Sequence, residues 1–313
     1  MASAILKRHE SIISQKLVVL GLSVQDCHSF SNNYSKKSTR YPITTSQRED
    51  ISSNTNNTSV RSIFMSSGPG KEETTWRSDC TQEEFMKKDE CILVDGNDMI
   101  VGHSSKYDAH RFDSPKQPTG LLHRAFSVFL FDSDSRLLLQ QRAASKITFP
   151  NVWTNTCCSH PLHGYSPTEV DDLSKSGNKA PGAARAAIRK LEHELGIDTS
   201  NFQVDDFKFL TRLHYCARDS MNPEWGEHEM DYILFCRKDV KDLLNPHPDE
   251  VQATRFVTRA ELKDMMRPDS GLLWSPWFRI ISERFLDAWW DDLDGTLSTD
   301  DHVEPDAIHK ILN

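Results

Sequence analysis

Strand-like and helix-like segments alternate along the chain from about residue 125 onward, and this alternation limits the fold more than any other feature of the sequence. Residues 125–142 contain two runs rich in Phe, Val and Leu on either side of a polar Asp-Ser turn, which is the pattern of a β-hairpin. Residues 152–161 have the character of a strand that Pro161 ends. Three further strand-like runs follow at 207–217, 228–238 and 251–258.

Helical patterns separate these strands. In residues 183–197 apolar side chains recur at helical spacing, and Gly196 stands where such a helix would end. Thr258 begins a Thr-x-x-Glu capping box, and Ser275 followed by Pro276 has the residue types expected at a helix cap and first helical position. Because strands and helices interleave, we predict an α/β (α+β) fold with a mixed β-sheet flanked by helices.

The N-terminal segment has a different composition. Residues 1–65 are rich in Ser, Thr and Asn and have few acidic residues before Glu49, which is the composition of an organelle transit peptide. A plain disordered tail is one alternative. A secretory signal is another, but polar residues interrupt the apolar stretch 11–24 and no clear small-residue cleavage site follows. We therefore expect a disordered leader at 1–65 and one folded domain at 66–313.

The net charge of −9 is unevenly distributed, with +4 on residues 1–70 and −13 on the remainder. An acidic body repels nucleic acid and anionic membranes, so it would bind an anionic small molecule only through local cations or a metal ion. No apolar run approaches the roughly 18 residues of a membrane span. The seven cysteines form no CxxC pair, which favours a reducing compartment over a disulfide framework.

The segment TNTCCSHP, residues 154–161, places two adjacent cysteines before a histidine. Side chains two residues apart in a strand share a face, so Cys158 and His160 should point the same way and Cys157 the opposite way. If His160 faces an active site, Cys158 is the sulfur that would react, and Cys157 packs in the interior.

The same alternation makes Glu227 and Glu229 a carboxylate pair on one face of a strand. Two carboxylates and three histidines would form a nitrogen and oxygen site suited to Mg²⁺, Mn²⁺ or Zn²⁺, and the candidate histidines are His110, His123 and His160. Spacing alone supports this site weakly, because a single histidine is more often a surface or hydrogen-bonded residue and a carboxylate pair is often a solvated strand end.

Basic residues lie beside the same segments, namely Lys106, Arg142, Lys146 and Lys190. Lysine and arginine, together with a metal ion, commonly hold a diphosphate group. Each of these residues taken singly is more often an ordinary surface charge. As a group they favour a phosphate-bearing small molecule as the ligand of this acidic protein.

Together these motifs resemble the type I isopentenyl-diphosphate isomerases, a family with the Nudix fold, and in particular a plant-like member with a leader. The resemblance covers roughly residues 90–290. It rests on six segments in the family's order: SKYDAHR, LLHRAFSVFLF, QQRAASKITFPNVWTNTCCSHP, RKLEHELGI, GEHEMDYILF and WSPWF. The combination of TNTCCSHP with GEHE is highly specific, whereas the helical segment alone is not.

The helical segment departs from the general Nudix pattern. Nudix hydrolases carry an Arg-Glu-apolar-x-Glu-Glu-x-Gly box that binds magnesium, and residues 189–196 here read RKLEHELG. Of the three acids of that box only Glu194 is kept, which favours an isomerase over a Nudix diphosphohydrolase. Lys190 stands where some family members have arginine, which keeps the charge but loses a bidentate contact.

The resemblance implies roles for the residues at matching positions. The first metal ion would be bound by His110, His123, His160, Glu227 and Glu229. A Mg²⁺ ion on the substrate diphosphate would be held by Glu194 and the main-chain carbonyl of Cys158. The phosphates would be contacted by Lys106, Arg142, Lys146 and Lys190. The catalytic pair would be Cys158 and Glu229, with Tyr215 assisting and Trp277 lining the hydrocarbon pocket.

The implied activity is the interconversion of isopentenyl and dimethylallyl diphosphate through a tertiary carbocation, in isoprenoid biosynthesis. The implied cofactor is Mg²⁺, with Mn²⁺ or Zn²⁺ as alternatives at the His/Glu site, and we expect a monomer that acts on a small allylic or homoallylic diphosphate. The expected location is the plastid, with the mitochondrion as an alternative, and the cytosol or peroxisome if translation starts at Met65. Two other interpretations stay open, a Cys/His nucleophilic hydrolase and a structural zinc site.

Overall fold

The computed structural model describes residues 81–112, 118–176 and 179–312. The expected leader at 1–65, with Met65, lies outside these described residues, and so does the expected start of the folded domain at residue 66. No helix of the described part is long and apolar enough to cross a membrane.

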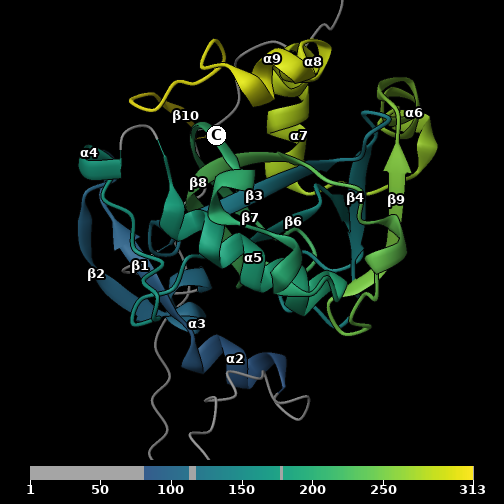
Figure 1. Cartoon of the computed structure of the whole chain (residues 1–313). Helices are drawn as coiled ribbons and strands as arrows, with labels where there is room; N and C mark the ends of the chain where they lie inside the picture. Colours follow the sequence, from purple (N-terminus) through teal and green to yellow (C-terminus); the bar gives the residue numbers. More distant parts are fainter. Residues whose placement is uncertain (1–80, 113–117, 177–178, 313) are drawn as a thin grey trace, which may run out of the picture. The chain divides into compact units, whose positions relative to one another are not determined.

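Within the described residues ten strands form one mixed sheet (Figure 1). Its main path has the order β10 (Ile308–Leu312), β7 (Lys208–Arg218), β8 (Gly226–Arg237), β3 (His123–Phe131), β1 (Glu90–Val94) and β2 (Ile100–Ser105). The other strands are β4 (Leu137–Arg142), β5 (Trp153–Thr154), β6 (Cys157–Ser159) and β9 (Val251–Val257). Parallel pairing of β3 with β8 and of β10 with β7 makes the sheet mixed, as predicted.

The expected β-hairpin at 125–142 forms only at its turn. The strands β3 and β4 meet only at Phe131 and Leu137, beside the turn, and then separate. All nine residues of β3 pair in parallel with β8, whereas β4 pairs with β9. The reason is that β6 pairs with Phe126, Ser127 and Val128 on the edge of β3 opposite β8, where β4 would have to continue. Every residue of β3 is buried, as in a central strand covered on both faces, so its apolar run is continuous rather than alternating.

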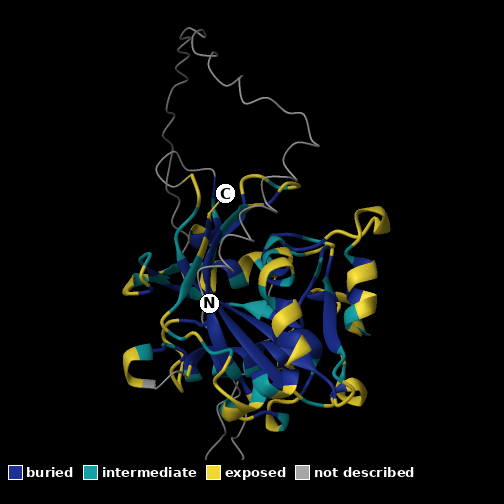
Figure 2. Cartoon of the chain, turned by 90° about the horizontal axis from the view of Figure 1, so that it is seen from above, coloured by how far each residue is buried: buried dark blue, intermediate teal, exposed yellow. Residues whose placement is uncertain are grey.

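Two apolar clusters lie on the two faces of the sheet. One contains Phe126, Val128 and Leu130 of β3 together with the helix α5 (Pro181–Leu195). The other contains Phe129 and Phe131 with the helices α7 (Pro276–Ile281), α8 (Asp287–Asp291) and α9 (Leu293–Ser298). Figure 2 shows the buried residues along the strands and the exposed residues on the helices and turns. Successive residues of β3 therefore contribute to opposite layers of the core.

The remaining helices are α2 (Gln82–Lys88), α3 (Lys106–His110), α4 (Leu173–Ser176) and α6 (Arg259–Met265). The helix signals of the sequence are observed. Thr258 and Ser275 cap α6 and α7 through their side chains, and Gly196 ends α5 in the left-handed conformation at φ 68°. After α7 the helix widens into a π-helical turn over Ser282–Leu286 before α8 begins.

Candidate active site

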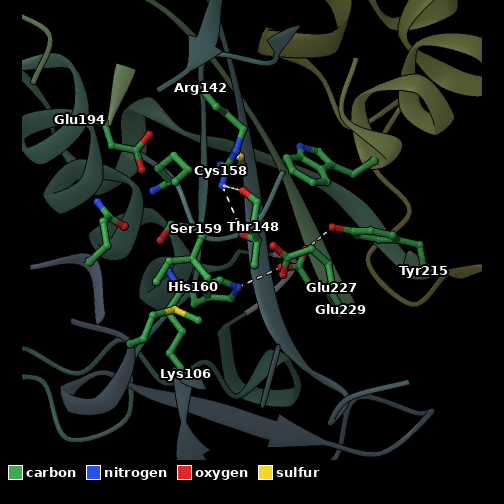
Figure 3. A pocket seen from close by; sticks show the side chains of 15 residues that line it. Lys106, Arg142, Thr148, Cys158, Ser159, His160, Glu194, Tyr215, Glu227 and Glu229 are labelled. Atoms are coloured by element: carbon green, nitrogen blue, oxygen red, sulfur yellow. Dashed lines mark hydrogen bonds and ion pairs between the residues drawn. The ribbon is translucent and has the colours of Figure 1, made fainter. Parts of the chain in front are cut away.

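The predicted site residues converge on one pocket (Figure 3). Ten of them line it: Lys106, Arg142, Lys146, Cys158, His160, Glu194, Tyr215, Glu227, Glu229 and Trp277. His110 and His123 lie beside His160, with ring centroids 4.8 and 4.9 Å from its ring. Lys190 does not line the pocket; its Nζ lies 3.2 Å from Oε1 of Glu194.

Strand pairing places the reactive groups side by side. Glu229 of β8 is paired with His123 of β3 on one side and with Tyr215 of β7 on the other. Directly paired residues point to the same face of a sheet, so these three side chains form a row across it. Cys158 of β6 is paired with Ser127 on the same strand as His123.

The two adjacent cysteines lie in different environments, as strand alternation requires. Cys158 lines the pocket together with His160, and its sulfur points toward Arg142, whose Nη1 lies 3.8 Å away. Cys157 is fully buried in the cluster beneath α5, where its thiol donates to Oε2 of Glu194 at 3.5 Å. The pocket therefore has direct access to only one of these two sulfurs.

Three histidines and two glutamates form a buried group: His110, His123, His160, Glu227 and Glu229. Each offers one ligand atom, and these atoms all lie within 4.8 Å of one another. Nε2 of His110 lies 2.8 Å from Oε2 of Glu227, and Nε2 of His160 lies 2.9 Å from Oε1 of Glu229. Nitrogen and oxygen donors of this kind bind metal ions in other proteins.

Two observations show that this group fits a cation. Nδ1 of His110 donates to the main-chain carbonyl of Lys106 at 2.6 Å, and Nδ1 of His123 donates to that of Leu121 at 2.7 Å, which leaves the Nε2 lone pairs directed at the group. These two Nε2 atoms and Oε2 of Glu227 are buried and make no hydrogen bond of acceptable geometry among the described residues. A cation would satisfy all three atoms.

Burial also favours the ligand form of the histidines. It lowers the pKa of His123 to about 3, with His110 contributing, and it holds the pKa of His160 well below its usual value, with Lys106 contributing. Both imidazoles are therefore neutral near pH 7, and the neutral imidazole is the form that binds metal ions.

Glu229 and Tyr215 share a short hydrogen bond. The Tyr215 hydroxyl donates to Oε2 of Glu229 at 2.5 Å, and both side chains are buried. Burial, together with the neighbouring carboxylates of Glu227 and Asp231, raises the pKa of Glu229 well above its usual value. The raised pKa favours the protonated carboxyl group, which can donate its proton.

Cys158 and Trp277 complete the inner end of the pocket. Burial raises the pKa of the Cys158 thiol to about 12, and the charge of Arg142 opposes this rise. The Trp277 indole is buried, and its Nε1 donates to Oδ1 of Asn155 at 3.0 Å, which fixes the ring. The ring centroids of Trp277 and Tyr215 are 6.3 Å apart.

Comparison with known proteins decides the family. A NUDIX domain matches residues 121–278. The chloroplastic isopentenyl-diphosphate Delta-isomerase 1 of Cannabis sativa is 48% identical over 238 residues, covering 74% of this chain and 78% of that protein. The isopentenyl-diphosphate Delta-isomerase I of Camptotheca acuminata is 47% identical over 239 residues, covering 75% of this chain and 96% of that protein. The chain belongs to the isopentenyl-diphosphate Delta-isomerase family. The predicted Nudix fold is thereby confirmed.

The candidate active site extends beyond the part that matches the NUDIX domain. Lys106 and His110 lie on α3, which precedes the matched residues 121–278. Glu194, the retained acid of the Nudix box, lies on α5 and accepts a hydrogen bond from Nε2 of Gln140 at 3.0 Å. The candidate active site thus combines the Nudix sheet and helix with residues that precede the matched domain.

Sequence reasoning missed Gln82 and Met86 of α2, which line the pocket, and Glu250, which pairs with the lining residue Lys146. Glu250 forms an ion pair with Lys146 and accepts a hydrogen bond from Gln82 of α2 at 3.0 Å. The Thr81 capping box was a local signal for α2, but no local signal places this helix at the pocket. Lys146 and Glu250 are 104 residues apart, so their contact depends on the tertiary fold.

Proposed function

We propose that this protein interconverts isopentenyl diphosphate and dimethylallyl diphosphate, in isoprenoid biosynthesis. The observation that carries the proposal is the joint placement of a hydrogen-bonded Glu229–Tyr215 pair and Cys158 in one buried pocket, next to a group of cations. The relatives that bear the isomerase name align with most of the chain, which supports the same reaction.

We assign the first half of the reaction to Glu229. Its carboxyl group gives its proton to the terminal methylene carbon, and the substrate becomes a tertiary carbocation. The Tyr215 hydroxyl, 2.5 Å from Oε2, stabilises the carboxylate that remains. The raised pKa of Glu229 keeps the proton available for this step.

The second half belongs to Cys158. Its sulfur, as thiolate, removes a proton from the carbon nearer the diphosphate, and the electrons of that C–H bond form the new double bond. Burial favours the thiol form of Cys158, with a pKa of about 12, whereas the charge of Arg142, 3.8 Å from the sulfur, favours the thiolate that this step requires. The carbocation itself adds positive charge beside the sulfur. Proton exchange with solvent then restores both groups.

The pocket must protect the carbocation from water. Trp277 is buried and held by Asn155, so its indole ring stays fixed at the pocket wall. The electron-rich face of an indole stabilises a nearby cation by about 1–2 kcal/mol when water is excluded. We therefore assign Trp277 to cation stabilisation as well as to the shape of the hydrocarbon pocket.

We infer that the His/Glu group binds a divalent metal ion. Mg²⁺ is the cofactor that the resemblance implies, with Mn²⁺ or Zn²⁺ as alternatives at this group, where the three imidazole donors favour Zn²⁺ over Mg²⁺. The ligands of the ion would be His110, His123, His160, Glu227 and Glu229. When bound, the ion supplies a positive charge that helps to set the proton affinity of the Glu229 carboxyl group.

The diphosphate would lie at the basic side of the pocket. Lys106, Arg142 and Lys146 line it, and Lys190 lies behind Glu194. In the structure Lys146 is paired with Glu250, so the diphosphate would have to compete for this lysine. Glu194 and the main-chain carbonyl of Cys158 are the groups we assign to a Mg²⁺ ion that arrives with the diphosphate.

Incubation of the purified protein with isopentenyl diphosphate and Mg²⁺ tests the proposal. We expect dimethylallyl diphosphate, detected by mass spectrometry after acid treatment or by NMR, and no release of phosphate. A Nudix hydrolase would release phosphate products from nucleoside diphosphate derivatives instead. A covalent acyl adduct on Cys158 would indicate a Cys/His hydrolase.

We further propose that residues 1–65 direct the protein to the plastid and that residues 66–313 form a monomeric catalytic domain. Three relatives carry the word chloroplastic in their names, which supports a plastid address. A fluorescent protein fused to residues 1–65 should enter plastids rather than mitochondria, and a form that starts at Met65 should stay in the cytosol or enter peroxisomes. Residues 66–313 alone should be active and elute as a monomer.

A further inference from the structure

A second group of two imidazoles and one carboxylate lies at the protein surface, away from the buried His/Glu group. It consists of Glu90 on β1, His103 on β2 and His163 on the segment after β6. Each of the three residues offers one ligand atom, and these atoms lie within 4.8 Å of one another. We propose that these residues form a second binding site, for a divalent transition-metal ion of the Zn²⁺ type.

Main-chain pairing holds the three residues together. Glu90 pairs with Ser105 and Ile92 with His103 across β1 and β2, so Glu90 and His103 are diagonal neighbours on one face. The main-chain N–H of His163 donates to the carbonyl of Glu90 at 2.9 Å. The three side chains therefore project from a fixed backbone and not from independent loops.

The side chains already contact one another. Nδ1 of His103 contacts Oε2 of Glu90, and the His103 and His163 rings stack with centroids 4.1 Å apart and an interplanar angle of 4°. An ion bound to both rings requires them to tilt, because a metal lies in the plane of the imidazole that binds it. His103 and His163 are exposed, so this tilt displaces no packed neighbour.

The donor set selects the class of ion. Two imidazole nitrogens and one carboxylate oxygen suit Zn²⁺, Co²⁺, Ni²⁺ or Cu²⁺, whereas Mg²⁺ and Ca²⁺ prefer oxygen ligands. Zinc binds such donors at about 2.0–2.2 Å, which brings the donor atoms to within about 4 Å of one another. The donor atoms, which lie within 4.8 Å of one another, would move closer together on binding, and solvent would supply the remaining ligand.

The site lies next to the candidate active site along the chain. His103 precedes Lys106 by three residues, and His163 follows His160 by three residues. An ion shared by Glu90, His103 and His163 would link the β1–β2 pair to the segment that carries His160. It would thereby stabilise the folded state, because it binds the native arrangement and not the unfolded chain.

Zinc counting with matched variants tests the proposal. The full chain is stripped with chelator and dialysed, and bound Zn²⁺ is then measured by equilibrium dialysis and atomic absorption. We expect His163→Ala and Glu90→Gln to bind one equivalent less than the parent protein. His309→Ala is the control, since His309 pairs with a single carboxylate, Glu304, at another surface position, and should bind the same amount as the parent.

Thermal unfolding gives a second measurement that does not depend on isomerase activity. Added Zn²⁺ should raise the Tm of the parent protein more than that of His163→Ala, while the two proteins should have similar Tm values in chelator. The proposal would be overturned if the parent and both site variants bound the same amount of zinc and showed the same Zn²⁺-induced increase in Tm. The three residues would then form only an ion pair with a stacked imidazole. Because all three residues are outside the buried His/Glu group, this result would leave the proposed function untouched.

Discussion

At the scale of single residues, the face of the strand on which a side chain lies determines whether that side chain reaches the pocket. Cys157 and Cys158 are identical in type and adjacent in sequence, yet one is packed beneath α5 and the other lines the pocket. Strand alternation separates them, and the sequence alone predicted that separation because it is a local property of the backbone. The burial that raises the pKa of Glu229 depends on the tertiary structure and could not be predicted in this way.

Substitution of the two cysteines measures this difference. Cys158→Ala should reduce turnover to background while the protein stays folded, because the group that removes the second proton is lost. Cys157→Ala should keep most of the activity. Steady-state rates and circular dichroism of both variants provide the test. An inactive Cys157→Ala protein with normal folding would show that the assignment of the reactive sulfur is wrong.

Two tyrosines make carboxylate hydrogen bonds of the same length, and they provide a matched pair. Tyr215 donates to Glu229 at 2.5 Å, and Tyr232 donates to Asp98 at 2.5 Å on the other face of the sheet. Tyr215→Phe should lower kcat by about 10–100-fold, as expected for the loss of a hydrogen bond to a charged group. Tyr232→Phe should instead lower the free energy of unfolding by about 1–3 kcal/mol and leave kcat near normal. The reverse pattern would contradict the role of Tyr215.

The histidine pair His214–His228 predicts acid sensitivity. Burial, with His228 and Lys310 nearby, lowers the pKa of His214 to about 4. In the unfolded chain this histidine has a pKa of about 6.5, so as the pH falls the unfolded state takes up a proton before the folded state does. The free energy of unfolding therefore decreases as the pH falls from about 6.5 to 4. His214→Gln should remove about 1–2 kcal/mol of this loss, measured by urea unfolding at pH 7 and pH 4.5. A His214→Gln protein that loses as much stability as the parent between these two pH values would contradict this account.

At the scale of elements, local signals were sufficient for the helix ends and insufficient for strand pairing. Thr258, Ser275 and Gly196 end or begin helices where the sequence indicates, because caps depend on neighbouring residues. The hairpin expected at 125–142 is confined to its turn because β6 pairs with Phe126–Val128 on the edge of β3 along which β4 would continue. The residues of a short apolar strand do not by themselves determine with which strand it pairs.

Helix α5, which carries the pocket residue Glu194, ends at Gly196, and substitution of this glycine tests the conformation of the helix end. A Cβ at this position would lie 2.3 Å from the main-chain oxygen of Asn245, and φ is already positive. Gly196→Ala should therefore cost about 2–4 kcal/mol of unfolding free energy from strain and overpacking. Gly271→Ala has nearly the same φ but open space around its Cβ, and should cost about 1–2 kcal/mol. Equal urea midpoints of unfolding for Gly196→Ala and Gly271→Ala would show that the contact with Asn245 adds no cost.

At the scale of the whole molecule, the site exists only in the assembled sheet. His110 on α3, His123 on β3 and His160 after β6 meet Glu227 and Glu229 of β8. The sequence identified these residues through their resemblance to a family, whereas their spacing gave weak evidence by itself. Contacts such as Lys146 with Glu250 were missed for the same reason, since no local pattern joins residues 104 apart.

Removal of metal from the whole protein separates a catalytic ion from a purely structural one. Chelation leaves Nε2 of His110 and of His123 buried without a hydrogen bond, so the Tm should fall. The lowered pKa values of His123 and His160 and the raised pKa of Glu229 nevertheless limit charge repulsion, so the stripped protein should remain folded by circular dichroism while turnover is lost. Readdition of Mg²⁺ or Mn²⁺ should restore both the Tm and the rate. Full activity in excess chelator would show that the metal ion has no part in the mechanism. A structural zinc site would be supported instead if the protein unfolded on chelation and showed no turnover even with metal bound.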